Sequence, residues 1–232
     1  MMLKPQGRVV MLSGATRGIG RALLERLLTA GCIVSAGVRD VSRLPAHPLL
    51  SVHRYDAAEV RGAAAWVGEV VAQHGRIDAV VNAAGINTRG TLLGNDDTPF
   101  EALWSVNTMG PMRVIRAAWP HLVASGTGRV VNIASLSGKR VRNDNLAYSM
   151  SKFAVMALTQ EVRRLGQEDG IRASALCPGF VDTDMTAHVT KWPREKMSRP
   201  EDIALLAEVL LHLPNTASVA ELLVNCRHED ML

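Results

Sequence analysis

The chain has 232 residues, of which 47% are hydrophobic and 21% are charged, as in ordinary soluble globular proteins. No apolar run approaches the ~18 residues that a membrane span needs, and residues 1–7 lack the apolar core of a signal peptide, so we expect a cytoplasmic protein with no membrane partner. The formal net charge of +4 is small, and no basic stripe with interleaved aromatic residues is present, which argues against nucleic-acid binding.

Short, continuous apolar runs predict seven β-strands, at residues 8–13, 32–38, 50–55, 78–83, 128–134, 171–177 and 221–225. Segments with helical spacing predict helices at residues 18–30, 57–74, 98–124, 147–165 and 200–213. Pro111 and Pro120 are expected to bend or divide the longest of these stretches. The connection over residues 41–49 is short, so we expect a turn there in place of a helix.

The alternation of strands and helices indicates the architecture. Continuous apolar strands are typical of a sheet whose two faces are both covered. We therefore predict a single α/β domain over residues 1–232, built on a doubly wound parallel sheet of about seven strands with helices on both faces. Ligands of such sheets bind at the carboxyl ends of the strands.

A glycine loop lies between the first predicted strand and the first predicted helix. Gly14, Gly18 and Gly20 have the spacing Gly-x-x-x-Gly-x-Gly. Glycines allow a tight turn and a close approach of the backbone to a ligand. The free N–H groups of the following helix can then face a pyrophosphate, so the loop predicts a nucleotide site.

Tyr148 and Lys152 are four residues apart on a predicted helix and share one of its faces. An ammonium close to a phenol favours the phenolate, so we expect the pKa of Tyr148 to be lowered from about 10 toward working pH. A tyrosine tuned in this way can give or take the proton of an alcohol. Taken alone, the pair is equally compatible with an ordinary surface pair on an amphipathic helix. Ser135 and the glycine loop are what favour catalysis.

Together with the glycine loop and the Tyr148/Lys152 pair, four further segments give the chain a family resemblance. They are Asn82-Ala83-Ala84-Gly85, Asn107, Asn132-Ile133-Ala134-Ser135 and Pro178-Gly179-Phe180-Val181-Asp182-Thr183. In this order the motifs resemble the single-domain short-chain dehydrogenase/reductase family, from about residue 8 to residue 225. The resemblance implies a Rossmann-like fold. Two departures are Ala83, in place of a second asparagine, and a short C-terminus.

The resemblance implies a role for each of four catalytic residues. Tyr148 would donate a proton to a carbonyl oxygen or accept it from an alcohol. Lys152 would lower the pKa of Tyr148 and hold the nicotinamide ribose. Ser135 would fix the same oxygen by a hydrogen bond, and its spacing to Tyr148 makes it a better candidate than Ser137. Asn107 would hold a water that links Lys152 to solvent.

The same resemblance implies a nicotinamide dinucleotide cofactor and a set of residues around it. Among them, Asp56 would bind the adenine amine and Thr183 the carboxamide. The expected cofactor-binding residues are Gly14, Thr16, Arg17, Gly18, Ile19, Gly20, Arg39, Asp56, Asn82, Ala83, Gly85, Tyr148, Lys152, Pro178, Gly179, Val181 and Thr183. The cysteines and histidines form no metal-ligand pattern, so no metal is expected.

Arg17 and Arg39 favour NADP(H) over NAD(H). Enzymes that prefer NAD usually end the second strand with an acidic residue for the ribose 2′-hydroxyl. Arginine instead binds a 2′-phosphate through paired hydrogen bonds. Asp40 leaves an alternative open, because it could pair with Arg39 or bind the ribose hydroxyls itself.

The main functional hypothesis is an oxidoreductase that acts on a small-molecule carbonyl or alcohol. The alternative is a nucleotide-sensing protein on the same fold. Lys139, Arg140 and Arg142 would suit a substrate that carries a carboxylate, although a solvated loop explains them equally well. Residues 186–196 are expected to cover the substrate. The apolar surface of the two long helical stretches favours a homodimer or homotetramer.

Overall fold

The computed structural model describes residues 1–142 and 144–229. It contains one parallel sheet of seven strands in the order β3-β2-β1-β4-β5-β6-β7. The strands are β1 (Val9–Ser13), β2 (Ile33–Val38), β3 (Leu50–Arg54), β4 (Ala79–Asn82), β5 (Arg129–Ile133), β6 (Arg172–Pro178) and β7 (Glu221–Val224). The predicted doubly wound α/β fold is confirmed.

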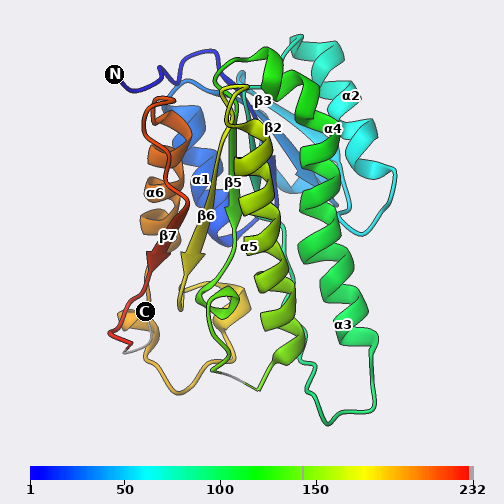
Figure 1. Ribbon diagram of the computed structural model, residues 1–232, viewed down its shortest axis with the longest axis vertical. Coiled ribbons are helices and arrows are strands. Elements are labelled where there is room, and N and C mark those ends of the chain that lie inside the picture. Colours follow the sequence, from blue (N-terminus) through cyan, green and yellow to red (C-terminus); the bar gives the residue numbers. More distant parts are fainter. Residues whose placement is uncertain (143, 230–232) are drawn as a thin grey trace.

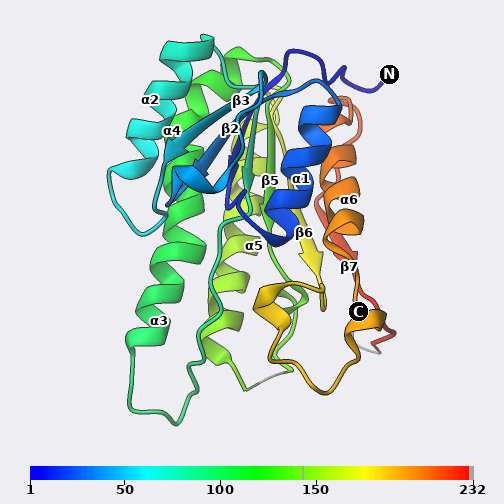
Figure 2. The same ribbon diagram turned by 180° about the vertical axis from the view of Figure 1, so that it is seen from behind.

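The described residues form six α-helices, which are α1 (Gly18–Thr29), α2 (Gly62–His74), α3 (Thr98–Leu103), α4 (Gly110–Ala124), α5 (Leu146–Gly166) and α6 (Pro200–His212). Figures 1 and 2 show α1 and α6 on one face and α2, α4 and α5 on the other. In the described part of the chain, no helix is long and apolar enough to cross a lipid bilayer.

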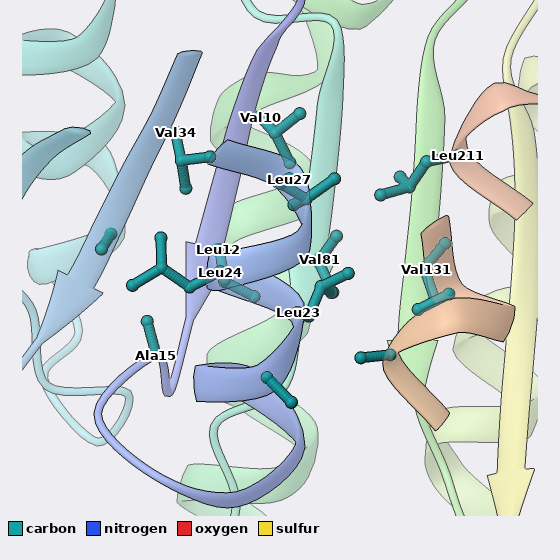
Figure 3. Close-up of a cluster of buried hydrophobic side chains, with 14 of the residues drawn as sticks. Val10, Leu12, Ala15, Leu23, Leu24, Leu27, Val34, Val81, Val131 and Leu211 are labelled. Atoms are coloured by element: carbon teal, nitrogen blue, oxygen red, sulfur yellow. The ribbon is translucent and has the colours of Figure 1, made fainter. Parts of the chain in front are cut away.

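Each face of the sheet has its own hydrophobic core. On one face, leucines of α1 and α6 pack against valines and leucines of the central strands, as Figure 3 shows. On the other face Trp66 is 1% exposed, and its Nε1 donates a hydrogen bond of 2.9 Å to the hydroxyl of Ser35 on β2. The ring occupies the space above Gly37, where an added Cβ would lie 2.7 Å from it. Burial on both faces explains why the strands are apolar throughout.

Helix α2 begins at Gly62, five residues later than the sequence predicted. Residues 57–61 precede the helix, and Asp56 holds the first of them in a turn. Its carboxylate accepts a hydrogen bond of 2.9 Å from the N–H of Ala58, and its carbonyl accepts one of 3.1 Å from the N–H of Glu59. Aspartate competes for nearby backbone donors in this way and delays the helix.

The long helical stretch predicted at residues 98–124 is divided by one turn of π-helix, η2 (Trp104–Met109). Pro111 follows at the start of α4 and has no N–H to donate to the carbonyl of Asn107, four residues before it. The regular α-helical pattern is therefore interrupted just before Pro111. By contrast, α4 continues through Pro120. The predicted turn between β2 and β3 is a short 3₁₀ helix, η1 (Val41–Arg43).

The sheet order reverses beside β1, which lies between β2 and β4. A crevice forms at such a point outside the carboxyl ends of the strands. Gly14 follows β1 there with a φ of +74°, and a Cβ on it would lie 2.6 Å from the backbone nitrogen of Ala84. Only glycine allows this conformation and this approach of two backbone segments.

Replacing Gly20 by alanine is expected to lower the free energy of unfolding by about 1–3 kcal/mol. The added Cβ would lie 2.2 Å from the carbonyl oxygen of Gly14, so the backbone must shift. Gly68 of α2 provides the matched control, because a Cβ there meets nothing within 4 Å. Gly68→Ala should stabilise the protein by ~0.5–1 kcal/mol through helix propensity. Urea unfolding measures both changes, and equal stabilities of the two variants would contradict the role of Gly20.

Candidate active site

A cleft of about 1140 Å³ lies at the carboxyl ends of the strands. All of the residues predicted to bind the cofactor or to act in catalysis line it, except Asn82 and Asn107. The glycine loop forms one end, and Ser135, Tyr148 and Lys152 lie further along the same cleft. The glycine loop near the start of the chain and the later residues Ser135, Tyr148 and Lys152 therefore line one cleft.

The N-terminus of α1 opens into the glycine-loop end of the cleft. Arg17 is the N-cap residue, yet its side chain makes no capping hydrogen bond, and the first turn contains no acidic residue. Gly18 adopts a φ of +54° at the first helical position. Unsatisfied N–H groups at a helix N-terminus, with no acidic residue in the first turn, suit the pyrophosphate of a dinucleotide. The residues present therefore fit this group.

Two arginines line the cleft beyond the end of β2. They are Arg39, as predicted, and Arg43, which sequence reasoning missed because it lies in the short 3₁₀ helix η1. Between them, the carboxylate of Asp40 accepts hydrogen bonds of 2.6 Å from the hydroxyl and 3.0 Å from the N–H of Ser42. These two bonds lower the pKa of Asp40. Its carboxylate is thus ionised and already has local donors.

Tyr148, Ser135 and Lys152 meet where α5 packs against the end of β5. The Ser135 side chain lies close enough to the Tyr148 hydroxyl to lower the pKa of the phenol. Lys152 is 6% exposed, and its Nζ donates a hydrogen bond of 2.8 Å to the carbonyl of Ile133 and lies 5.6 Å from the centre of the Tyr148 ring. Ser135 also accepts a hydrogen bond of 3.1 Å from the N–H of Ser137, which fixes its hydroxyl.

The expected lowering of the pKa of Tyr148 by Lys152 is not what the structure shows. Burial raises the pKa of Tyr148 to about 12, against a smaller lowering by the hydrogen bond with Ser135. Burial also lowers the pKa of Lys152 to about 8. The cause is the low dielectric of the site, which disfavours both charged forms. The ammonium also donates a hydrogen bond to the carbonyl of Ile133.

Asn107 lies behind the cleft and is 1% exposed. Its side-chain oxygen accepts a hydrogen bond of 2.9 Å from the N–H of Ile86, and its Nδ2 donates to the carbonyl of Ile86 at 3.0 Å and to the hydroxyl of Ser151 at 3.1 Å. Asn107 therefore connects the loop after β4 to α5, and its role toward a water stays a prediction.

Asn82 is also buried behind the cleft, at the end of β4. Its Nδ2 donates a hydrogen bond of 2.8 Å to Asn132 on β5, which in turn donates one of 2.9 Å to Thr159 on α5. This buried chain of hydrogen bonds fixes the catalytic helix against the central strands. Contact of Asn82 with a cofactor remains a prediction.

Asn145 is a site residue that sequence reasoning missed. It caps α5, since its side-chain oxygen accepts a hydrogen bond of 3.2 Å from the N–H of Tyr148. The same oxygen accepts one of 3.2 Å from the N–H of Gly90, and its Nδ2 donates to Asn87 and to the carbonyl of Thr88. An asparagine three residues before Tyr148 was the available signal, because asparagine is a preferred N-cap.

Lys139, Arg140 and Arg142, the three cations between Ser135 and Tyr148, do not all line the cleft. Lys139 pairs with Glu221 on β7 at 2.5 Å, away from the residues that line the cleft. Arg140 and Arg142 do line it. Residues 186–196 are predicted to lie over the substrate, and the part of this segment up to Lys191 contributes several lining residues, whereas Trp192 contacts Arg227. Within the described residues, no group of His, Cys, Asp or Glu side chains is arranged to hold a metal ion.

Comparison with known proteins identifies the family. The model of the short chain dehydrogenase family matches residues 8–194. The chain belongs to the short-chain dehydrogenase/reductase family. This short-chain dehydrogenase/reductase is 38% identical to an agropine synthesis reductase of Rhizobium rhizogenes, over 97% of this chain and 54% of that protein. It thus spans about half the length of that curated relative. An uncharacterized oxidoreductase of Staphylococcus saprophyticus is 31% identical over 96% of this chain and 99% of its own length.

Solved structures give the same result for this short-chain dehydrogenase/reductase. An alcohol dehydrogenase of the archaeon Thermococcus sibiricus, solved with 5-hydroxy-NADP, has a TM-score of 0.85 at 29% identity and covers 94% of this chain and 96% of its own. A 3-ketoacyl-(acyl-carrier-protein) reductase of Brucella melitensis, solved with NADH, has a TM-score of 0.88 at 22% identity, with coverage of 96% and 98%. Because its identity is only 22%, the similarity to the Brucella reductase shows a shared fold alone.

Ultraviolet titration of the two tyrosines in this short-chain dehydrogenase/reductase tests the electrostatics of the site. Burial raises the pKa of Tyr55 as well as that of Tyr148, so phenolate absorbance of the ligand-free protein should stay absent up to about pH 10, the usual value for tyrosine. In Tyr55→Phe the remaining signal should have its midpoint near 12. Ser135→Ala should move it higher still, because the hydrogen bond from Ser135 lowers this pKa.

The same shift predicts how stability depends on pH. The folded protein holds the Tyr148 proton more tightly than the unfolded chain, so the free energy of unfolding should fall as pH rises from about 10 to about 12. Circular dichroism during the titration separates ionisation in the folded state from unfolding. A phenolate midpoint below 10 in the folded, ligand-free protein would contradict the role of burial.

Proposed function

We propose that this protein is an oxidoreductase that transfers a hydride between a nicotinamide cofactor and a small carbonyl/alcohol pair, with Tyr148 as the general acid/base. The observation that carries the proposal is that Ser135, Tyr148 and Lys152 line the same cleft as the glycine loop. Names of relatives support it, since they include a reductase, an oxidoreductase and an alcohol dehydrogenase.

Each catalytic side chain has a distinct task in this proposal. With its raised pKa, Tyr148 is protonated at neutral pH, which is the form that can donate a proton to the carbonyl oxygen during reduction. Ser135 holds the same oxygen by a second hydrogen bond and orients it. Lys152 is mainly an ammonium at neutral pH and can hold ribose hydroxyls as a hydrogen-bond donor. A bound nicotinamide cofactor would supply the hydride.

Tyr148→Phe is expected to cut turnover by about 10² or more, because it removes the proton donor. Cofactor affinity should stay near that of the wild type, since the ring is retained. NADPH consumption with a panel of aldehydes, ketones and keto acids measures turnover, and cofactor titration measures affinity. Ser135→Ala should also impair turnover, and Ser137→Ala is its matched control.

Turnover within a few-fold of wild type in Tyr148→Phe would show that Tyr148 is not the general acid/base. A wild-type protein that binds cofactor but reduces none of the panel would favour the sensing alternative.

We further propose that the cofactor is NADP(H). Two observations support this. Arg39 and Arg43 both line the cleft, and the carboxylate of Asp40 already accepts two hydrogen bonds from Ser42. Arg17, in the glycine loop, forms an ion pair with Asp184 at 3.3 Å, and both side chains are largely exposed. An exposed pair of this kind is weak and can exchange for a phosphate contact.

NADPH should therefore bind about 10- to 10³-fold more tightly than NADH. Arg39→Ala should remove most of this preference and leave NADH affinity almost unchanged, because NADH has no 2′-phosphate. Arg43→Ala should reduce the preference by a smaller factor. Dissociation constants of the two cofactors for wild type and variants decide the matter. Tighter binding of NADH by the wild type would mean that Asp40 sets the choice.

We also propose that the protein forms a homodimer or homotetramer. Trp104 on η2 and Met150 and Phe153 on α5 are between 43% and 50% exposed, although all three are large and apolar. Figure 1 shows α5 beside α3 and α4 on the outer face of the molecule. Such a face is typical of subunit contacts.

Light scattering should give a mass above the 25.0 kDa of the monomer at micromolar concentration. Phe153→Glu should dissociate a dimer formed through α5, because it places a charge in an apolar contact. Leu205→Glu on α6 is the matched variant on the opposite face, where Leu205 is 46% exposed. It should reduce a tetramer to a dimer and leave a dimer unchanged. A monomeric wild type would refute the proposal.

A further inference from the structure

The end of the described chain runs along the wall of the catalytic cleft. Glu229 lies after β7 in a segment without helix or strand, and it lines the same cleft as Tyr148. Its side chain is nevertheless only 4% exposed. Figure 1 shows this part of the chain at the end of the molecule to which β6 and β7 point. A buried carboxylate in such a place needs cationic partners.

Three arginines supply those partners. Arg140 donates hydrogen bonds of 2.6 and 2.9 Å to one oxygen of Glu229 and one of 2.8 Å to the other. Arg227 donates one of 3.3 Å, and Arg142 lies at 3.6 Å. Burial alone would raise the pKa of Glu229, but its bonds to Arg140, Asn225 and Arg227 outweigh it, and the pKa lies below its usual value. The cluster therefore holds an ionised carboxylate.

Among residues 1–142 and 144–229, the cluster contains three guanidiniums against one carboxylate. Within the described residues, no other carboxylate forms an ion pair with these arginines. Glu221 is paired with Lys139, and Asp182 is paired with Arg194. A second anion, or a different one, would thus find a favourable potential here.

Arg227 also has unused hydrogen-bonding capacity. Its Nε is buried and has no hydrogen-bond partner in the described part of the chain. The guanidinium carbon lies 5.7 Å from the ring centre of Phe180 and 5.5 Å from that of Trp192. Cation–π contacts of this kind hold a guanidinium without using its N–H groups. A buried donor without an acceptor is costly, which indicates that the arrangement is suited to a further oxygen atom.

We propose that Arg140, Arg142 and Arg227 form a carboxylate-binding subsite of the substrate cleft, in which Glu229 is a displaceable internal occupant. The inference rests on the proposed function, because it makes the substrate an oxo acid whose carbonyl meets Tyr148 and whose carboxylate meets the arginines. A substrate carboxylate would form the same paired hydrogen bonds that Glu229 makes. Residues 225–229, which include Glu229, form no helix or strand, so release of its side chain does not require a helix or strand to unfold.

Binding of glutarate, followed through Trp192 fluorescence, tests the subsite without any turnover. Trp192 faces Arg227, and Trp192→Phe identifies its share of the signal. Glu229→Gln should bind glutarate about tenfold more tightly than the wild type, because the internal competitor loses its charge. Glu221→Gln is the matched control, since it frees Lys139 outside the cleft and should leave binding unchanged. Arg227→Gln should weaken binding, and dimethyl glutarate should not bind.

Steady-state kinetics then connect the subsite to the reaction. Oxo acids of graded chain length should have a KM about tenfold lower than their methyl esters, and Arg227→Gln should remove this difference with kcat within a few-fold. The subsite is refuted if Glu229→Gln binds glutarate no more tightly than wild type, or if acids and esters behave alike. If glutarate binds as expected but no carbonyl compound is reduced, the subsite stands and the proposed function fails.

Discussion

The close approach of the glycine loop to the segment after β4 is the constraint on which the cleft depends. Gly14 can lie against Ala84, and Gly20 against Gly14, because neither glycine carries a Cβ. This contact brings the N-terminus of α1 to the point where the sheet order reverses. The hydroxyl of Ser13 reinforces it with a hydrogen bond of 3.2 Å from the N–H of Ala84. The glycine-loop end of the cleft and the end that contains Tyr148 thus share one framework.

Buried polar side chains hold the catalytic end of that framework. The Asn82–Asn132–Thr159 chain of hydrogen bonds crosses from β4 to α5, and Asn107 reaches α5 from the π-helical turn. In a low dielectric such satisfied networks fix one arrangement, since any other leaves a buried group unpaired. The same low dielectric keeps Tyr148 neutral. Burial therefore explains both the single arrangement of these polar side chains and the neutral state of Tyr148.

The sequence was sufficient for features that depend on local pattern. Apolar runs, glycine spacing and the positions of Ser135, Tyr148 and Lys152 predicted the fold and the side chains that line one cleft, and Pro111 predicted the division of the stretch 98–124. The sequence failed where tertiary surroundings decide. The pKa of Tyr148 depends on burial, and the Arg140–Glu229 contact joins residues 89 apart in the chain. Helical spacing between Tyr148 and Lys152 could not reveal that the ammonium is bonded to Ile133.

Asn145 has a consequence for how such a site can change. One side chain caps the helix that carries Tyr148 and also holds residues 87–90, which come from a different part of the chain. The loop and Tyr148 are thus coupled, so a new loop that lacks acceptors for the amide of Asn145 would disturb the phenol as well as the pocket. Loop exchange between relatives, whether by evolution or by design, can alter selectivity independently of chemistry only when the loop and its asparagine are transferred together.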